Sequence, residues 1–327
     1  MITEALDSVD RNCFISNETR RSIVSSLRKT GSLSSIATTH NVSYPSVYRA
    51  LEKVEYHSAP KELPEVLSFD EFKANTNEGK YAFVAIDPVA HKIIEILGDR
   101  KYSSVYSFFS KYPEEERLKV KFVVSDLWRP YLKIAKTLFP NATFVADKFH
   151  YQRLVNNAFN SVRKNISEKL DPSVAYQVKK YWKLLNKKES RLYCKEQKYS
   201  HWLKRPVLQT ELVQSLIDVD NTLNEAYQLY QEFLTLINLK NESEQKKLFD
   251  TWLDKASTSN IKEMNNAAKS LKTWSDGIKA SFVPYNGKTL NNGTIEGFNN
   301  RIKVIKRVSY GYRSFINFKK RILLSFF

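Results

Sequence analysis

Residues 66–98, VLSFDEFKANTNEGKYAFVAIDPVAHKIIEILG, change the pattern of the chain from helical to alternating. VLSFDEF, YAFVAID and KIIEILG each predict a β-strand, because alternation of apolar and polar residues gives a strand one buried and one solvated face. The break PVAH between the second and third stretches suits a tight turn. These residues therefore predict three consecutive strands that begin a sheet.

The elements that follow complete an α/β pattern. We expect a helix near 103–111, a strand in VKFVVSD (120–126), a helix over 129–138 and a strand in ATFVAD (142–147). Periodicity alone makes this a mixed α/β domain. The order β-β-β-α-β-α-β is that of a ribonuclease H-like core, a mixed sheet in which the first and fourth strands are neighbours.

The N-terminal residues 1–58 predict a helix-turn-helix DNA-binding segment. Within SLSSIATTHNVSYPSVYRALEKV, apolar residues recur at helical spacing, and Ser32 and Ser43 can begin the second and third helices. The exposed face of the third helix would carry Tyr44, Ser46, Tyr48 and Arg49. A plain three-helix packing unit is the alternative. SAPKELPEV, with two prolines, predicts a linker.

Beyond the predicted sheet the pattern becomes helical. We expect the catalytic core to span 64–150 and 286–327, separated by an all-α insertion over 151–285 that no strand interrupts. The four tryptophans of the helical part, including Trp182, are expected to pack in its core. The last block begins in a Gly/Asn turn and becomes a basic amphipathic helix.

Charge and composition restrict the function further. The 327 residues carry 52 Lys plus Arg against 35 Asp plus Glu, a net charge of +17 that attracts polyanions such as DNA. Only 8 glycines argue against a Gly-rich phosphate loop, and no run of ~18 apolar residues predicts a membrane span. Cys13 and Cys194 are too few for a disulfide framework or a four-cysteine zinc site, which fits a reducing cytoplasm.

Three carboxylates stand on elements that a sheet could bring together: Asp70 on the first predicted strand, Asp126 at the end of the fourth, and Glu296 at the start of the C-terminal helix. Such hard oxygen ligands suit Mg²⁺ or Mn²⁺. Each has an alternative role as a helix cap or turn residue. Asp87, in VAIDPV, is a second candidate for the first carboxylate; we favour Asp70 because it lies on the first strand.

Several blocks together resemble bacterial insertion-sequence transposases of the DDE superfamily, and are most similar to the insertion-sequence L-three (ISL) family. They are DLWRPY, PNATFVADKFHYQRLVNNAFNSVRK and TIEGFNNRIKVIKRVSYGYRSFINFKKRI. The resemblance implies a ribonuclease H-like catalytic domain interrupted by a helical insertion. It also implies metal-dependent cleavage of DNA at element ends and strand transfer into target DNA, with Asp147 and His150 supporting the site. Pairing of two ends implies a homo-oligomer.

Basic and amide side chains follow Glu296 within three turns of the same helix and would contact DNA; a solvated helix face is the alternative reading. They are Asn299, Asn300, Arg301, Lys303, Lys306 and Arg307.

One departure from the family pattern concerns the N-terminus. These transposases usually carry a four-cysteine zinc ribbon, whereas Cys13 stands alone before the predicted helix-turn-helix. We therefore expect a truncated copy or gene fragment as one possibility. Two alternative functions stay open: an inactive copy that only binds DNA, and a ribonuclease H-like nuclease acting on branched or hybrid substrates.

Overall fold

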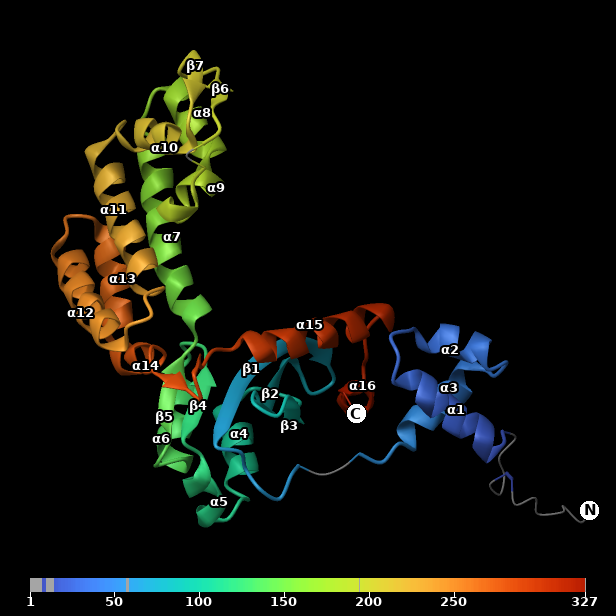
Figure 1. Cartoon of the computed structure of the whole chain (residues 1–327). Coiled ribbons are helices and arrows are strands. Elements are labelled where there is room, and N and C mark those ends of the chain that lie inside the picture. Colours follow the sequence, from blue (N-terminus) through green and yellow to red (C-terminus); the bar gives the residue numbers. More distant parts are fainter. Residues whose placement is uncertain (1–7, 10–14, 57–58, 194, 327) are drawn as a thin grey trace, which may run out of the picture. The chain divides into compact units, whose positions relative to one another are not determined.

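A computed structural model describes residues 8–9, 15–56, 59–193 and 195–326, and both cysteines lie outside these ranges. The chain divides into two compact units, which are described separately (Figure 1). Unit 1 combines Met1–Phe144 with Asn292–Phe327, and unit 2 is Val145–Asn291.

A five-stranded mixed sheet organises the first unit, in the order β3-β2-β1-β4-β5. The antiparallel meander β1–β2–β3 and the parallel pairing of β1 with β4 confirm the predicted neighbourhood of the first and fourth strands. The strands are β1 Val66–Thr76, β2 Gly79–Asp87, β3 Lys92–Leu97, β4 Phe122–Ser125 and β5 Thr143–Ala146.

Three helices connect β3, β4 and β5. The two predicted ones are α4 (Tyr102–Phe109) and α6 (Arg129–Leu138). The third, α5 (Glu114–Lys119), was not predicted; it is short and buries no residue, so it has no apolar periodicity. Its first turn holds three glutamates, which the positive end of a helix dipole stabilises.

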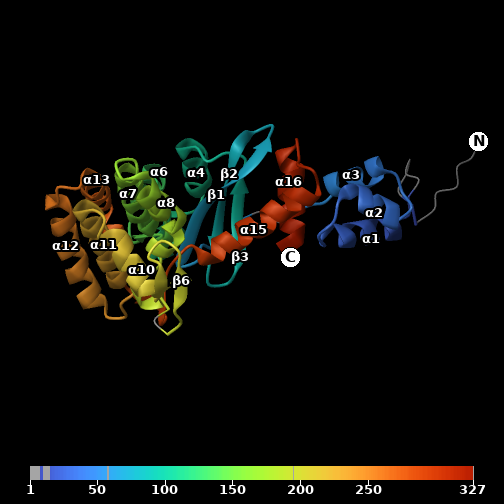
Figure 2. The ribbon, with the colours of Figure 1, turned by 90° about the horizontal axis from the view of Figure 1, so that it is seen from above.

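The sheet has a different core on each face. Phe69 of β1 packs with Phe83, Phe109 and Tyr131 on the face that α4 and α6 cover. The opposite face, with Phe72, contacts α15 (Gly293–Val308) and α16 (Phe315–Phe326). Figure 2 shows α15 and α4 on opposite sides of the meander. Alternation along β1 therefore sends Asp70 to the α15 side, together with Phe72.

Three N-terminal helices belong to the same unit: α1 (Asn17–Leu27), α2 (Leu33–Thr39) and α3 (Tyr44–Glu52). The Ser16 and Ser32 hydroxyls accept hydrogen bonds from the backbone at the starts of α1 and α2. The buried residues of these helices join one apolar cluster with the α15–α16 face of the sheet. The N-terminal helices and the sheet thus share a core.

Helices account for most of unit 2. They are α7 Lys148–Ser167, α8 Pro172–Lys180, α9 Trp182–Leu185, α10 Gln209–Ile217, α11 Asn221–Leu236, α12 Glu242–Thr258, α13 Lys262–Lys272 and α14 Ser275–Ala280, with a 3₁₀ turn at Glu189–Arg191. Phe159 of α7 stacks on Tyr230 of α11 at 5.0 Å between ring centroids. Trp252 is buried and donates its indole N–H to the Leu229 carbonyl.

Two β-hairpins correct the expectation that no strand would interrupt this helical part. They are β6 (Lys198–Ser200) with β7 (Arg205–Val207), and β8 (Pro284–Tyr285) with β9 (Lys288–Thr289). The second turns at Asn286 and Gly287, both with positive φ, which is the backbone of a two-residue hairpin turn. Strands of two or three residues are too short to produce a visible alternation.

Among the described residues, no helix is long and apolar enough to cross a membrane.

Candidate active site

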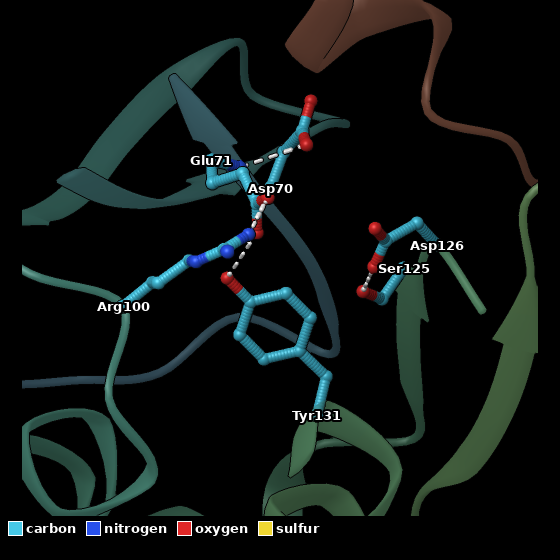
Figure 3. A network of polar contacts seen from close by, with 6 residues as sticks. All are labelled: Asp70, Glu71, Arg100, Ser125, Asp126 and Tyr131. Carbon is cyan, nitrogen blue, oxygen red and sulfur yellow. Dashed lines mark hydrogen bonds and ion pairs between the residues drawn. The ribbon is translucent and has the colours of Figure 1, made fainter. Parts of the chain in front are cut away.

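Asp70 and Asp126 stand at matching positions on neighbouring strands. β1 and β4 pair in parallel register, with Ser68 opposite Val124. Asp70 follows Ser68 by two residues, and Asp126 follows Val124 by two residues. Asp126 lies just past the end of β4. Neighbouring strands are ~4.8 Å apart, and residues two positions apart share a face. The register therefore places both residues at the same edge of the sheet, where the Ser125 hydroxyl donates to the Asp126 carboxylate at 3.1 Å (Figure 3).

Helix α15 crosses β1 next to Asp70. The Asn299 amide donates a hydrogen bond of 2.7 Å to the Asp70 carboxylate, and the Asn292 amide donates to the Phe69 carbonyl at 3.3 Å. The other Asp70 oxygen accepts from the Glu71 backbone N–H at 2.7 Å. Two anchored points, one at each side of Glu296, thus fix the first two turns of α15 against the strand that carries Asp70.

Glu296 lies three residues before Asn299, about 4.5 Å along the helix axis. Its side chain is exposed, and its backbone N–H donates to the Asn292 carbonyl at 2.9 Å. Within the described residues, no three His, Cys, Asp or Glu side chains are already gathered closely enough to hold a metal ion. The fold therefore places Asp70 and Asp126 on neighbouring strands and Glu296 on a helical turn next to Asn299.

Asp87 has a different environment. It ends β2 beside the start of β1, since Ile86 pairs with Ser68 and Val84 with Asp70, and β1 lies between β2 and the strand β4 that leads to Asp126. Its carboxylate accepts the backbone N–H groups of Val89 and Ala90 at 2.8 and 2.9 Å. These bonds are those of an Asx turn. The geometry supports Asp70 as the partner of Asp126.

A second polar network lies on the other face of β1, where sequence reasoning did not look. Glu71 forms an ion pair with Arg100 and accepts a bond from the buried Tyr131 hydroxyl at 3.5 Å (Figure 3). The Arg100 guanidinium lies 4.5 Å from the Tyr81 ring centroid and 5.3 Å from that of Trp128. Burial, helped by the nearby Asp126 charge, raises the pKa of Glu71 although Arg100 opposes the shift. Glu71 belongs to the predicted strand VLSFDEF, but no local signal in the sequence links it to Arg100.

The predicted DNA-contacting residues of α15 divide into two groups. Asn300, Lys303 and Arg307 lie on the same exposed stripe as Glu296, and Arg301 is exposed with its guanidinium 4.7 Å from the Phe326 ring centroid.

Asn299 corrects the prediction of DNA contact, whereas DNA contact by the partly exposed Lys306 stays a prediction. Asn299 is only 5% exposed and contacts Asp70, so it positions a carboxylate rather than facing DNA. The Lys306 amine donates to the Lys73 carbonyl at 2.9 Å, and burial together with the Lys73 charge lowers its pKa. Both belong to the side of the helix that faces the sheet, which helical periodicity alone could not orient.

On α3, Tyr44 and Arg49 are exposed as predicted, and Ser46 is partly exposed. Tyr48 is partly buried: it packs against the shared apolar cluster and stacks on Tyr44 at 6.4 Å between centroids, and its contact with DNA stays a prediction. Its large ring completes the contact of a short helix with the core.

Asp147 and His150 belong to the start of unit 2. Asp147 occupies the N-cap position of α7 and is 3% exposed. Its carboxylate lies 3.9 Å from the His150 Nε2 atom one turn later. The described geometry of unit 2 pairs these two residues, and their role in the site remains a prediction.

Comparison with known proteins identifies the family of the chain. Residues 67–322 match the profile of a family of transposases, the DDE transposases of ISL3-type insertion sequences. The chain belongs to this family. The matched range includes Asp70, Asp126 and Glu296.

Two curated relatives are similar to parts of this DDE transposase. The transposase for insertion sequence element IS1001 of Bordetella parapertussis is 27% identical over 253 residues, covering 76% of this chain and 58% of the relative. A protein of Lactococcus lactis subsp. lactis named ATP-dependent protease is 32% identical over 135 residues, or 39% of each chain. The chain thus spans less than two thirds of the length of each.

Proposed function

We propose that this chain is a DDE transposase that cuts DNA at insertion-sequence ends and joins the cut strand to target DNA. The observation that carries the proposal is the matched register of Asp70 and Asp126 on parallel neighbours β1 and β4. Family membership supports the same reading, and the comparisons do not favour the DNA-binding-only copy or the general nuclease. The core would be ribonuclease H-like, with 151–285 as a largely helical insertion.

The donor set fits a pair of Mg²⁺ or Mn²⁺ ions. Asp70 and Asp126 offer carboxylate oxygens from strands ~4.8 Å apart, and a two-metal site needs a spacing of about 4 Å. Glu296 would complete the set by turning its exposed side chain toward them. Ions held by these carboxylates would supply activation of the attacking oxygen and stabilisation of the leaving oxygen of the phosphodiester.

The protein's own contribution would be positioning. The Asn299 amide donates a hydrogen bond to one carboxylate oxygen of Asp70, and the Glu71 backbone N–H donates to the other. The stripe that continues from Glu296 through Asn300, Lys303 and Arg307 would bind phosphates of the DNA that enters the site. Exposed Tyr44 and Arg49 on α3 would contact a second DNA segment if α1–α3 act as a helix-turn-helix.

Replacing Asp126 with Asn tests the proposal. The substitution keeps the shape of the side chain and removes a metal-binding charge, so we expect Mg²⁺-dependent nicking of end-containing DNA to fall to background. Binding measured without Mg²⁺ should stay close to that of the parent. Chelation with EDTA should abolish nicking by the parent and leave binding.

The binding surface gives the matched comparison. Neutral substitutions at Lys303 and Arg307 should weaken DNA binding and lower the slope of log K against log salt by up to about one unit per lost phosphate contact.

Unchanged nicking by the Asp126→Asn protein would contradict the DDE mechanism. Equal nicking of DNA with and without the element ends would favour a general nuclease. Pairing two ends requires a homo-oligomer, which sedimentation with end-containing DNA would show.

A further inference from the structure

One end of unit 2 exposes four aromatic rings. This end is built from α8, α9, the β6–β7 hairpin and the start of α10 (Figure 1). The exposed fractions are 60% for Tyr176, 45% for Trp182, 64% for Tyr193 and 59% for Tyr199. Trp182 therefore does not pack in the core as expected from the sequence. Clustered exposed apolar surface of this kind marks a binding site more often than scattered single residues do.

Lysines alternate with these rings. The Lys180 amine lies 5.1 Å from the Tyr181 ring centroid and 5.8 Å from that of Tyr176. Lys187 lies 4.6 Å from the Tyr193 centroid, and Lys183 lies 5.7 Å from that of Trp182. Lysine amines and aromatic rings therefore lie next to each other on this surface.

A cavity of about 500 Å³ opens in this surface, within the size range of ligand sites. Its cationic lining consists of Lys180, Lys183, Lys187 and Lys198, against Glu196 as the acid among its described lining residues. The aromatic lining includes Tyr181, Tyr193 and Tyr199.

Part of the cavity lining is apolar. It consists of Leu184, Val207 and Leu212, and Val207 and Leu212 are buried. A flat group that stacks on a tyrosine ring in this cavity would lose water from its faces, while the lysines of the same lining would hold an anion.

We propose that this cavity binds an unpaired segment of DNA, with a base against the exposed tyrosines and backbone phosphates on the lysines. Bases stack on aromatic side chains irrespective of sequence, and amines neutralise the backbone. In an intact duplex the bases are stacked on each other and present no free face, so the site should prefer single strands. This inference rests on the proposed function, because it takes DNA as the substrate of the protein.

Full-length parent and variants are tested by fluorescence anisotropy with a labelled oligo(dT) and with a duplex of equal length, without Mg²⁺. We expect tighter binding of the single strand. Tyr199→Ser should weaken single-strand binding at least about fivefold, while Tyr199→Phe, which keeps the ring, should bind like the parent. A 2-aminopurine within the oligonucleotide should change its fluorescence on binding to the parent and much less with Tyr199→Ser.

Charge is tested separately. Replacing Lys180 and Lys198 with Ser should lower the salt slope of single-strand binding by roughly 0.7 for each lost contact. The control replaces Lys269 and Lys272, exposed lysines of α13 outside the cavity, and should leave binding nearly unchanged. Circular dichroism melting of every variant shows whether the fold is kept; Tyr199 is exposed, so its loss should not unfold the unit.

Several outcomes overturn the inference. They are parent-like single-strand binding by Tyr199→Ser, equal weakening of duplex and single-strand binding, and stronger capture of an acidic peptide than of oligo(dT). If the parent binds single strands through the cavity but never nicks element ends, the proposed function is overturned and the single-strand site is not. If the parent nicks element ends but does not bind single strands, only the proposed single-strand site is overturned.

Discussion

Asn299 holds the first carboxylate of the proposed metal site, although it comes 229 residues later in the sequence. Replacing it with Ala removes a bond to a charged acceptor that contributes about 1.5–3 kcal/mol. If that bond orients Asp70 in the transition state, nicking should fall roughly 10- to 150-fold and half-maximal activity should need more Mg²⁺. Mg²⁺ titration of the nicking rate checks this.

Asn300→Ala is the matched control, because Asn300 is exposed on the next position of α15. It should change DNA binding modestly and leave the Mg²⁺ requirement unchanged. The same Mg²⁺ curve for Asn299→Ala and the parent would mean that Asp70 does not depend on this bond.

Lys306 gives a prediction about pH, because burial and the Lys73 charge lower its pKa. Its lowered pKa means that, between that lowered value and the ordinary 10.5, the unfolded chain binds more protons than the folded chain. The free energy of unfolding contributed by Lys306 should therefore rise with pH through this window. Lys306→Met keeps the stem and removes the rise.

Urea denaturation of parent and Lys306→Met at pH 8 and near pH 10.5 measures the difference. The parent should gain stability relative to the variant at the higher pH. Lys303→Met, at an exposed position, keeps Lys306 and serves as the control, so it should follow the parent. A parallel pH dependence of the parent and Lys306→Met would contradict the burial-based argument.

At the scale of elements, α16 joins the N-terminal helices to the sheet. Arg321 is fully buried on this helix, and its Nη2 donates to the Lys29 and Gly31 carbonyls beyond the end of α1 at 2.9 and 3.0 Å. Lys319 pairs with Glu95 of β3, and Lys320 donates to the Glu52 carbonyl at the end of α3. One helix thus contacts α1, α3 and the sheet.

Truncating Arg321 should loosen this connection. Arg321→Ala loses two hydrogen bonds and leaves a cavity, so we expect a loss of about 2–4 kcal/mol in unfolding free energy. Arg321→Met should cost less, because burial of the charge is itself unfavourable and lowers the pKa of Arg321. Urea denaturation gives the energies, and hydrogen exchange should show faster opening at the end of α1. An Ala variant as stable as the parent would contradict the assigned role.

The sequence predicted those elements that are long enough to show a period. The meander, β4 and the helices α4 and α6 could be read because their apolar residues repeat, and Asp70 and Asp126 followed from strand ends. The contact of Asn299 with Asp70 could not be read, because the pairing of distant segments has no local signal. The hairpin at Asn286 and Gly287 did leave one, an Asn-Gly dipeptide, which the helical periodicity around it obscured.

For the whole molecule, two compact units with separate cores predict two unfolding steps. Phe69→Ala should lower the transition of unit 1 and Phe233→Ala that of unit 2, each by about 3–5 kcal/mol, because both rings are fully buried. Scanning calorimetry of the two variants distinguishes the steps. A single transition that both substitutions shift equally would show that the units unfold as one.

Unit 1 is made from two pieces of chain, and this has a consequence for synthesis on the ribosome. Its sheet face with Phe72, Val84 and Ile96 is covered only when residues 292–327 have emerged, after all of unit 2. At 5–20 residues per second the delay is roughly 10–30 s, during which that apolar face is open to other chains. Newly made protein should therefore depend on chaperones, or on dilution, more than its finished fold suggests.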